Sequence, residues 1–393
     1  MIGIKETVAY IGNFGFPDKN ASGKRVYGNC KVLLKLGYKV VCIGPGSESK
    51  VCIDDIDLYS IDRGNEIQRV LQSRLSEVEK IIETENVSIV IIYGALFTEK
   101  ENSKLISWCH VRSIKVIYDQ VDWLDLNWHN PLRGIIRYRN QQLLDRKVIP
   151  ACDGVICISS YLSEYHKKRG MATVVIPPLS SEVTKSEQID SDIDDIIHLV
   201  YAGTTSDINR PTSQWKDRID IMFKKLSEVA NDKTLKPFHI DIFGMTMDQY
   251  IDMFPYDEKK QGRQVIDQLG ERVCFHGLVP NSEATEEIRK ANFTVLIRDK
   301  KRSTMAGFPT KVSESISFGT PVLCNDTSDI NSYLISGVTG FVMDDVTAMF
   351  RKAFSMSKKE IVRMKEACSD NPFYYEKYCE CMSTFMGQIQ RNV

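Results

Sequence analysis

The stretch FTVLIRDKKRSTMAGFPTKVSESISFGTPVLCND, residues 293–326, joins an apolar run, a basic loop, a helix-like segment and a second apolar run. The β-branched and aromatic residues of the first run predict a strand that ends at Arg298. Pro309 suits the first position of a helix, and Gly319 suits the stop at its carboxyl end. A strand, a helix and a further strand in this order are typical of a parallel sheet covered by helices.

The same alternation runs along the whole chain. Apolar β-branched runs, most of them separated by longer helix-like segments, include TVAYIG, KVVCIG, VSIVIIY, IKVIYD, GVICIS and ATVVIPP, and later IIHLVYAG, FHIDIFG, RVCFHG, FTVLIRD, TPVLCND and GFVMDD. A polar, acidic segment at 183–195 divides the two groups and predicts a linker. We therefore predict an α/β fold of two doubly wound, Rossmann-like domains, 1–185 and 186–371, facing each other across a cleft. A terminal helix at about 372–393 is expected to pack back on the first domain.

Composition narrows the class of protein. A chain of 393 residues favours two domains, and a net charge of −1 argues against bulk attraction to nucleic acid or to an anionic membrane. The eleven Cys residues show no CxxC and no Cys/His metal spacing, so we expect free thiols in a reducing cytosol and no bound metal. No apolar run approaches the roughly 18 residues that span a bilayer, and the N-terminus is typical of a strand rather than of a signal peptide. A cytoplasmic protein is predicted.

Five of the histidines and the two aspartate-rich strings are not assigned a functional role. Helix or strand patterns, and no metal spacing, surround His110, His166, His198, His239 and His276. They are expected to be structural. The strings DSDIDD and DDID, at 190–195 and 54–57, are interpreted as solvated segments.

The start of the predicted helix is a candidate anion site. A helix N-terminus offers unpaired N–H groups and a partial positive charge, and Lys311 adds a full charge in the first turn. Glu314, three residues on, shares a face with Lys311. A phosphate would meet the helix start and Lys311, while one carboxylate would accept hydrogen bonds from both hydroxyls of a ribose. The alternative is a surface helix with a Lys–Glu pair.

A second loop points to the same edge of the same sheet. In LVYAGTTSDINRPTSQWKDRID, residues 199–220, a strand ends in a small-residue loop that carries basic side chains before a helix. Loops after parallel strands gather at one edge, so two basic loops there suit a diphosphate. The candidate residues of both loops are Gly203, Arg210, Lys216, Arg298 and Arg302. The absence of GxGxxG argues against a dinucleotide dehydrogenase.

The first half offers weaker candidates. In VIYDQVDWLDLNWH, residues 116–129, a strand end is followed by the ionisable groups Asp119, Asp122 and His129. Asp122 is the candidate for a catalytic or acceptor contact, and the alternative is an Asp that caps a turn. The segment 128–147 carries Arg133, Arg137, Arg139, Arg146 and Lys147 among apolar residues. It predicts contact with anionic lipid at the inner face of the plasma membrane; the alternative is an internal helix with a solvated basic face.

Several motifs, in this order, resemble glycosyltransferase family 4, whose fold is GT-B, and especially its bacterial capsule, O-antigen and exopolysaccharide enzymes. The motifs are NASGKRVYGNCKVLLKLGYKV, DGVICISSYLSEYHKKRG with VVIPP, YAG followed by KD, and GFPTKVSESISFGTPV. The resemblance implies a nucleotide-sugar donor in the C-terminal domain, a UDP-sugar by family habit. It also implies transfer with retention and without metal, to a lipid-linked saccharide or polysaccharide acceptor held by the N-terminal domain.

Carried over by position, the resemblance assigns the ribose to Glu314 and the diphosphate to Lys216 and Arg210. Lys311 would stabilise the leaving diphosphate, and Gly23 would approach it from the other domain. One departure stands out, because the first Glu of the family's E-x7-E pattern is Ala306 here. A non-catalytic nucleotide-sugar-binding partner subunit and a UDP-sugar 2-epimerase therefore stay as alternatives.

Overall fold

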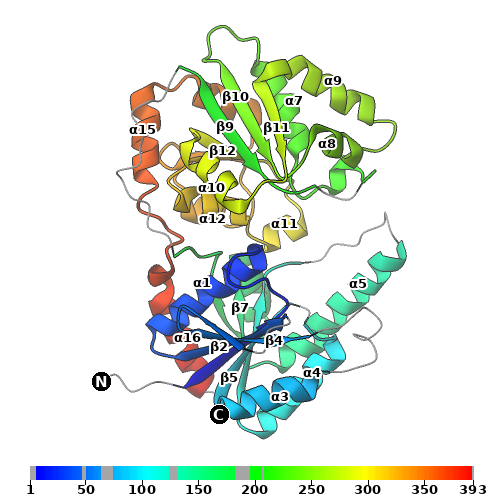
Figure 1. The fold of residues 1–393 in the computed structure, drawn as a ribbon, viewed down its shortest axis with the longest axis vertical. Coiled ribbons are helices and arrows are strands. Elements are labelled where there is room, and N and C mark those ends of the chain that lie inside the picture. Colours follow the sequence, from blue (N-terminus) through cyan, green and yellow to red (C-terminus); the bar gives the residue numbers. More distant parts are fainter. Residues whose placement is uncertain are drawn as a thin grey trace. The chain divides into compact units, whose positions relative to one another are not determined.

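A computed structural model of the chain describes residues 6–46, 50–62, 74–94, 96–123, 131–181, 195–205 and 208–391. The chain divides into two compact units, each with its own sheet and covering helices (Figure 1). The N-terminal unit comprises Met1–Ser181, Ala306–Phe308 and Tyr374–Val393, and the C-terminal unit comprises Glu182–Met305 and Pro309–Phe373. The predicted α/β class with two doubly wound, Rossmann-like units is confirmed. Apart from Asp195, the predicted linker lies outside the described residues.

The N-terminal sheet has eight strands in the order β3-β4-β2-β1-β5-β6-β7-β8. Their bounds are β1 (Thr7–Gly12), β2 (Lys39–Pro45), β3 (Lys50–Ile53), β4 (Ile56–Ile61), β5 (Val87–Tyr93), β6 (Lys115–Gln120), β7 (Gly154–Cys157) and β8 (Ala172–Val175). The helices of this unit are α1 (Ala21–Lys35), α3 (Leu75–Thr84), α4 (Glu99–Val111), α5 (Pro131–Leu143), α6 (Ser160–Lys167) and α16 (Cys379–Arg391). The six apolar runs predicted in the first half are all strands of this sheet.

One edge of this sheet was not predicted. Strands β3 and β4 form an antiparallel hairpin, and β4 pairs parallel to β2. Asp54 and Asp55 form its turn with φ values of +49° and +64°. Two consecutive residues at positive φ are what a two-residue hairpin with a type I′ turn requires, and Asp tolerates that conformation. The string DDID is therefore a turn followed by the first residues of a strand.

The terminal helix α16 completes the N-terminal core. Its side chains Met382, Phe385 and Ile389 are buried in the cluster that also contains Val8 of β1. At Gly154 of β7, a Cβ atom would lie 2.5 Å from Cδ1 of Ile389, so the helix packs directly on the sheet there. The last residues of the chain thus supply core volume to the unit formed by the first residues.

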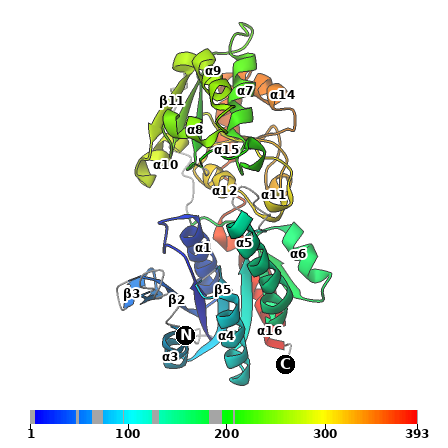
Figure 2. The same ribbon diagram turned by 90° about the vertical axis from the view of Figure 1, so that its right-hand side faces the viewer.

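The C-terminal sheet is wholly parallel, in the order β11-β10-β9-β12-β13-β14. Its strands are β9 (Ile197–Ala202), β10 (Phe238–Phe243), β11 (Val273–Gly277), β12 (Phe293–Leu296), β13 (Val322–Cys324) and β14 (Gly340–Val342). Its helices are α7 (Ile219–Val229), α8 (Met247–Met253), α9 (Lys259–Leu269), α10 (Asn281–Lys290), α11 (Arg302–Ala306), α12 (Thr310–Ser317), α13 (Ile330–Tyr333), α14 (Val346–Phe354) and α15 (Lys358–Ala367). Figures 1 and 2 show α10 and α12 on one face of this sheet and α7 on the other.

The order of these strands reverses between β9 and β12. The chain proceeds outward from β9 through β10 to β11, then returns to pair β12 against the other side of β9. Ligands of such sheets bind beyond the carboxyl ends of the strands at this reversal. The loops after β9 and β12 therefore occupy the place where the fold favours a binding site.

His166 of α6 is a buried neutral group. Burial lowers its pKa to about 4, and its Nε2 lies 2.5 Å from Oε1 of Gln120. In the unfolded chain the imidazole takes up a proton near pH 6.5, whereas in the folded chain it stays neutral down to about pH 4. The contribution of His166 to stability is therefore fully present above pH 6.5 and is lost as the pH falls from 6.5 toward 4.

This linkage gives a measurable difference between two variants. Wild type is expected to lose about 2 kcal/mol more unfolding free energy than His166→Gln between pH 7.5 and pH 5. Urea unfolding at both pH values measures it, and the shared carboxylates cancel in the comparison. Parallel pH dependences of the two proteins would show that folding leaves the pKa of His166 unchanged.

Candidate active site

The helix α12 starts and stops where the sequence predicts. Pro309 is its N-cap residue, and Gly319, with φ of +81°, follows its end. Val312 and Ile316 are fully buried, while Lys311 and Glu314 are half-buried. The apolar row thus anchors the helix in the core, while Lys311 and Glu314 stay partly accessible. Before it, however, the predicted polar loop is partly wrong, because residues 302–306 form the short helix α11.

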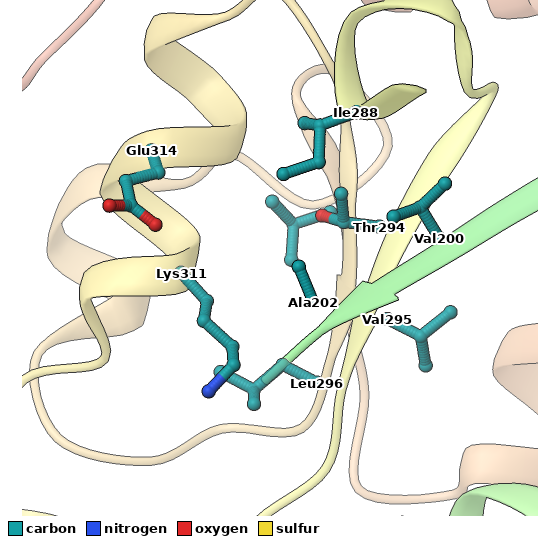
Figure 3. Close-up of a pocket in the computed structure, with 9 residues that line it drawn as sticks. Val200, Ala202, Ile288, Thr294, Val295, Leu296, Lys311 and Glu314 are labelled. Carbon is teal, nitrogen blue, oxygen red and sulfur yellow. The ribbon is translucent and has the colours of Figure 1, made fainter. Parts of the chain in front are cut away.

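Lys311 and Glu314 line one pocket, as their spacing predicts. Its other walls come from the sheet and from α10, and include Val200, Ala202 and Ile288. Figure 3 shows both charged side chains coming from α12, with the amino group of Lys311 reaching toward the end of β9. The pocket therefore combines an apolar wall with one cation and one carboxylate.

Asp217 gathers the cations of this edge. Its Oδ1 accepts from Nε of Arg298 at 2.7 Å, and its Oδ2 accepts from Nζ of Lys311 at 2.8 Å. The hydroxyl of Tyr201 donates to Oδ2 as well, at 3.0 Å. Burial opposes the charge of Asp217, but Lys311 and Arg298 hold the pKa of its carboxyl well below the usual range. One negative and two positive charges leave this Asp217 group with a net charge of +1.

Arg298 is a buried cation with one side-chain nitrogen that no described residue accepts a hydrogen bond from. Its side chain is 6% exposed, and its Nη1 has no hydrogen-bond partner among the described residues. Asn325 fixes its backbone from both sides, since Oδ1 accepts from the N–H of Arg298 and Nδ2 donates to its carbonyl. A buried guanidinium N–H without a partner costs free energy unless a ligand accepts from it. Arg298 thus has a buried cationic donor available for a ligand, and its binding of an anion stays a prediction.

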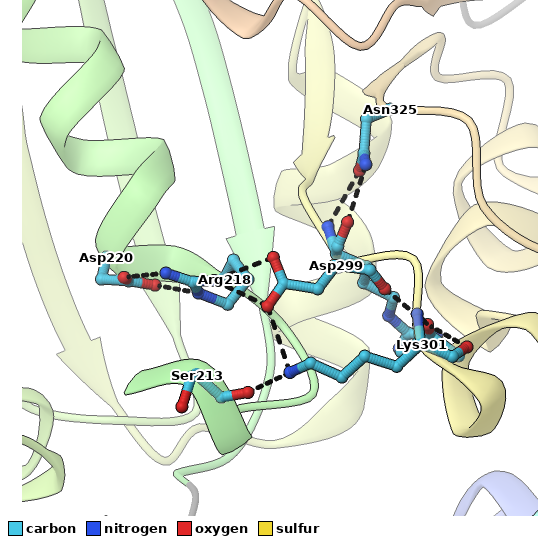
Figure 4. Close-up of polar contacts among 8 residues, drawn as sticks. Ser213, Arg218, Asp220, Asp299, Lys301 and Asn325 are labelled. Carbon is cyan, nitrogen blue, oxygen red and sulfur yellow. Dashed lines mark hydrogen bonds and ion pairs between the residues drawn. The ribbon is translucent and has the colours of Figure 1, made fainter. Parts of the chain in front are cut away.

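A second ion network ties the two loops together (Figure 4). Arg218 donates to both carboxylate oxygens of Asp299, and Nη2 donates to Asp220 at 2.7 Å. Lys301 pairs with Asp299 at 3.1 Å and donates to the carbonyl of Ser213. The loop after β12 is therefore clamped to the segment that precedes α7. Such a network keeps the Asp217 group in one geometry before any ligand arrives.

The end of β9 leaves little room for a side chain at position 203. A Cβ atom at Gly203 would lie 2.8 Å from Cε of Lys311 and 2.6 Å from the hydroxyl of Tyr201. At both distances something must shift, so a larger residue would displace the Lys311 chain. The predicted Gly203 thus lies beside the Asp217 group, where its lack of a side chain gives Lys311 its path.

The other predicted basic residues lie at different places on this edge. Lys216 is exposed and directly precedes Asp217, and Arg302 is exposed at the first position of α11. Arg210 is half-buried, its N–H donates to the carbonyl of Met253, and its carbonyl accepts from the indole of Trp215. None of the contacts described for these three places them on Asp217. Their assignment to a diphosphate stays a prediction.

In the N-terminal unit, Gly23 has a packing role. The Oδ1 atom of Asn20 accepts from the N–H of Gly23 at 2.8 Å and caps α1. A Cβ atom on Gly23 would lie 2.0 Å from the carbonyl oxygen of Gly15, so only glycine fits at this helix start. The approach of a diphosphate to Gly23 stays a prediction.

Asp119 is a structural residue rather than an exposed acid. Its carboxylate is fully buried, and Nη2 of Arg25 donates to it at 2.6 Å. Asp122 is exposed at the strand end, and its catalytic role stays a prediction. Trp128 and His129 lie outside the described residues.

Part of this chain matches a known protein family, and nearly the whole chain superposes on solved structures. Residues 205–358 match the family described as Glycosyl transferases group 1, and no curated protein matches. The solved structure of a sucrose-phosphate synthase from Thermosynechococcus elongatus superposes with a TM-score of 0.68 at 12% identity, covering 98% of this chain and 99% of that one. The chain has the GT-B fold.

Two more solved structures share this GT-B architecture. A glycosyltransferase from Rickettsia africae covers 99% of this chain and 100% of its own, with a TM-score of 0.63 and 12% identity. The Anabaena protein HepE, solved with UDP-glucose, gives a TM-score of 0.62 at 12% identity, over 98% of this chain and 100% of that one. The family match within the C-terminal unit and the GT-B fold together support a glycosyltransferase.

Sequence reasoning missed Asp217, the residue at the centre of the site. Its only local signal is that it follows Lys216 shortly before a helix. Its cationic partners are 81 and 94 residues away along the chain. Pairing at that separation depends on the strand order of the sheet, which the local pattern does not contain.

Proposed function

We propose that this GT-B chain is a family 4-like glycosyltransferase that moves a sugar from a nucleotide diphosphate, a UDP-sugar, to a lipid-linked saccharide or polysaccharide acceptor, as in bacterial capsule or O-antigen assembly. The observation that carries the proposal is that Lys311 and Glu314 line one pocket, and that Lys311 shares Asp217 with Arg298, whose buried Nη1 has no partner among the described residues. HepE was solved with UDP-glucose, which supports the choice of donor class.

The residues divide the donor between them. Arg298 and Lys311 carry one positive charge more than Asp217 cancels, so an entering diphosphate meets fixed cations. Glu314, one helical turn along, would accept from the two ribose hydroxyls. The apolar wall of Val200, Ala202 and Ile288 would face the rest of the nucleoside.

We propose transfer with retention, in which the cations of the site stabilise charge on the leaving group. The bond from the anomeric carbon to the donor phosphate breaks, and a bond to the acceptor oxygen forms on the same face. The acceptor's proton passes to the departing phosphate oxygen. Because the Asp217 group holds its cations before the reaction, they stabilise the charge that grows on the diphosphate without reorganisation. These cations supply the charge that a metal ion supplies elsewhere, so we propose metal-independent transfer.

Nucleotide titration tests this proposal. UDP, GDP and ADP are titrated calorimetrically into wild type, Glu314→Ala and the control Glu283→Ala, an exposed Glu of α10, with and without Mg²⁺. Selective binding without metal is expected, weakened about 10- to 100-fold in Glu314→Ala, because a hydrogen bond to a charged group contributes about 1.5–3 kcal/mol. The proposed donor site would be contradicted if no nucleotide bound to the folded protein, or if wild type and Glu314→Ala bound nucleotide equally well.

Ala306 favours one further candidate, a nucleotide-sugar-binding partner without catalysis. This residue ends α11 and is buried, and it offers no carboxylate at the family's sugar-contacting position. The purified chain decides between the two readings. Turnover by the chain alone would exclude the non-catalytic partner, whereas nucleotide binding without turnover in any acceptor mixture would favour it.

The segment 128–147 supports a second part of the proposal, contact with an anionic membrane. The apolar side chains Ile135, Ile136, Tyr138 and Leu143 of α5 are between 41% and 59% exposed. Arg139, Arg146 and Lys147 are exposed beside them, while the side chains of Arg133 and Arg137 lie outside the described part. Exposed apolar residues among cations are typical of helices that lie on anionic lipid. No helix in the described ranges is long and apolar enough to cross a membrane.

Vesicle sedimentation tests the lipid contact. Wild type is expected to sediment with vesicles that contain anionic phospholipid, and both Arg137→Glu/Arg139→Glu and Ile135→Ser/Ile136→Ser are expected to stay in solution. Val111→Ser removes a single exposed apolar residue of α4 and serves as the matched control. Unchanged sedimentation of both double variants would reject a membrane role for α5.

A further inference from the structure

One edge of the C-terminal sheet collects side chains that bind metals. Half of the chain's six His residues lie on the neighbouring strands β9, β10 and β11, and two further donors accompany them. Residues two apart on a strand share a face, so His239 and Asp241 project together from β10, as do Cys274 and His276 from β11. Asp241 is the register partner of Cys274, which brings the two pairs side by side.

The donor atoms converge. Nε2 of His276 lies 2.6 Å from Oδ1 of Asp241, and Nε2 of His239 lies 3.4 Å from the same oxygen. The donor atoms of Asp241, Cys274 and His276 all lie within 4.8 Å of one another. The ring of Phe243 stacks on His276 with centroids 4.5 Å apart, which fixes the plane of the imidazole.

We propose that Asp241, Cys274 and His276 form a binding site for a divalent transition metal of the zinc class, with His239 as a candidate fourth ligand. A tetrahedral zinc ion at about 2.0–2.3 Å from each donor places those donors roughly 3.3–3.8 Å apart. The observed spacing needs only side-chain adjustment to reach that geometry.

The donor set selects this class of ion. A thiolate and imidazoles together disfavour Mg²⁺ and Ca²⁺, which take oxygen ligands, and suit Zn²⁺. The side chains of His276 and Asp241 are 34% and 21% exposed, so an ion has a path from solvent. Binding would release the thiol proton of Cys274, so the affinity is expected to fall as the pH is lowered.

The position of the site indicates a stabilising role. It lies across β10 and the edge strand β11, whereas the Asp217 group lies at the reversal between β9 and β12. An ion there would tie the outer strand to its neighbour by bonds that the unfolded chain lacks. The proposal therefore stands independently of the transferase reaction and predicts no change in nucleotide binding.

Zinc titration of the full chain tests the site. The chelator-treated protein is titrated with ZnCl₂ against a metal-sensing dye, and the variants are Cys274→Ser and His276→Ala. Two matched controls are His110→Ala, from an exposed His–Asp pair at 3.1 Å on the other unit, and Cys381→Ser, an exposed Cys of α16. The expected result is one equivalent bound by wild type and both controls, with affinity at least tenfold weaker in both site variants.

Cobalt substitution adds a readout of the ligands. Co²⁺ is expected to give thiolate charge-transfer absorption with wild type and His110→Ala, and none with Cys274→Ser. Zinc should also raise the melting temperature of wild type and leave that of His276→Ala unchanged. No zinc binding by wild type, or wild-type affinity in either site variant, would overturn the proposal.

Discussion

Replacing Asp119 with Ala is expected to lower the free energy of unfolding by about 3–5 kcal/mol, because it leaves the buried charge of Arg25 without its partner. The two side chains are 0% and 2% exposed, and Nε and Nη2 of Arg25 both donate to the carboxylate. Burial opposes the charge of Arg25, and in the wild type Asp119 raises the pKa of its guanidinium. Because an arginine guanidinium keeps its proton in proteins, Arg25 stays charged in the variant. Urea unfolding followed by circular dichroism measures the loss.

The surrounding network makes this loss larger than that of an isolated pair. The hydroxyl of Tyr10 donates to Asp119, Nδ2 of Asn29 donates to Tyr10 at 2.9 Å, and Nη1 of Arg25 donates to the carbonyl of Ile176. These bonds connect β1, α1 and β6 through the core, and removing their shared acceptor leaves several donors unsatisfied.

A surface pair provides the control for this variant. Lys35 and Glu376 form an ion pair at 2.9 Å with side chains 55% and 39% exposed, so Glu376→Ala should lower the free energy of unfolding far less than Asp119→Ala does. The double variant Arg25→Met/Asp119→Leu should recover part of the stability, since it removes both charges. An Asp119→Ala protein as stable as Glu376→Ala but without turnover would contradict this structural role and indicate a catalytic one.

Lys311→Met is expected to lower kcat/KM for the sugar donor about 10²- to 10³-fold, the effect of removing one preorganised group that stabilises developing charge. The leaving diphosphate gains charge in the transition state, so most of the loss should fall on kcat rather than on KM. Asp217 keeps Arg298 and Tyr201 as partners in this variant, so the fold should survive. Nucleotide release from the donor that wild type uses fastest gives the rates.

A second lysine separates this effect from a general loss of charge. Lys225 of α7 pairs with Glu228 at 2.9 Å on the surface of the same unit, and Lys225→Met removes one charge away from the Asp217 group. Wild-type rates are expected for that control. A Lys311→Met protein as active as Lys225→Met would mean that Lys311 only neutralises Asp217.

The strands were predictable because each one is a local pattern. Parallel strands covered on both faces are continuous apolar runs, and every such run that the sequence offers is a strand of one of the two sheets. The hairpin of β3 and β4 was not predicted, because its strands are only partly apolar and its turn is Asp-Asp rather than Asn-Gly. The helix α11 was not predicted, because its short, polar sequence is also typical of a loop.

The site was predictable only where its residues are near in sequence. Lys311 and Glu314 are one helical turn apart, so their shared pocket follows from helix geometry. The cationic partners of Asp217 and of Asp119 lie 81 or more residues away, and strand order brings them together. The group of Asp241, Cys274 and His276 is hidden for the same reason, since its residues come from two strands and match no linear metal motif.

Hydrogen–deuterium exchange with and without UDP tests most directly whether the donor binds at α12 and its neighbouring loops. UDP is expected to slow exchange in peptides that cover 201–205, 297–301 and 309–318, because a bound diphosphate and ribose would hold the Asp217 group and the first turns of α12 closed. Peptides of α16 should exchange as before. Protection confined to residues 6–181, or no protection at saturating UDP, would contradict the placement of the donor site in the C-terminal unit.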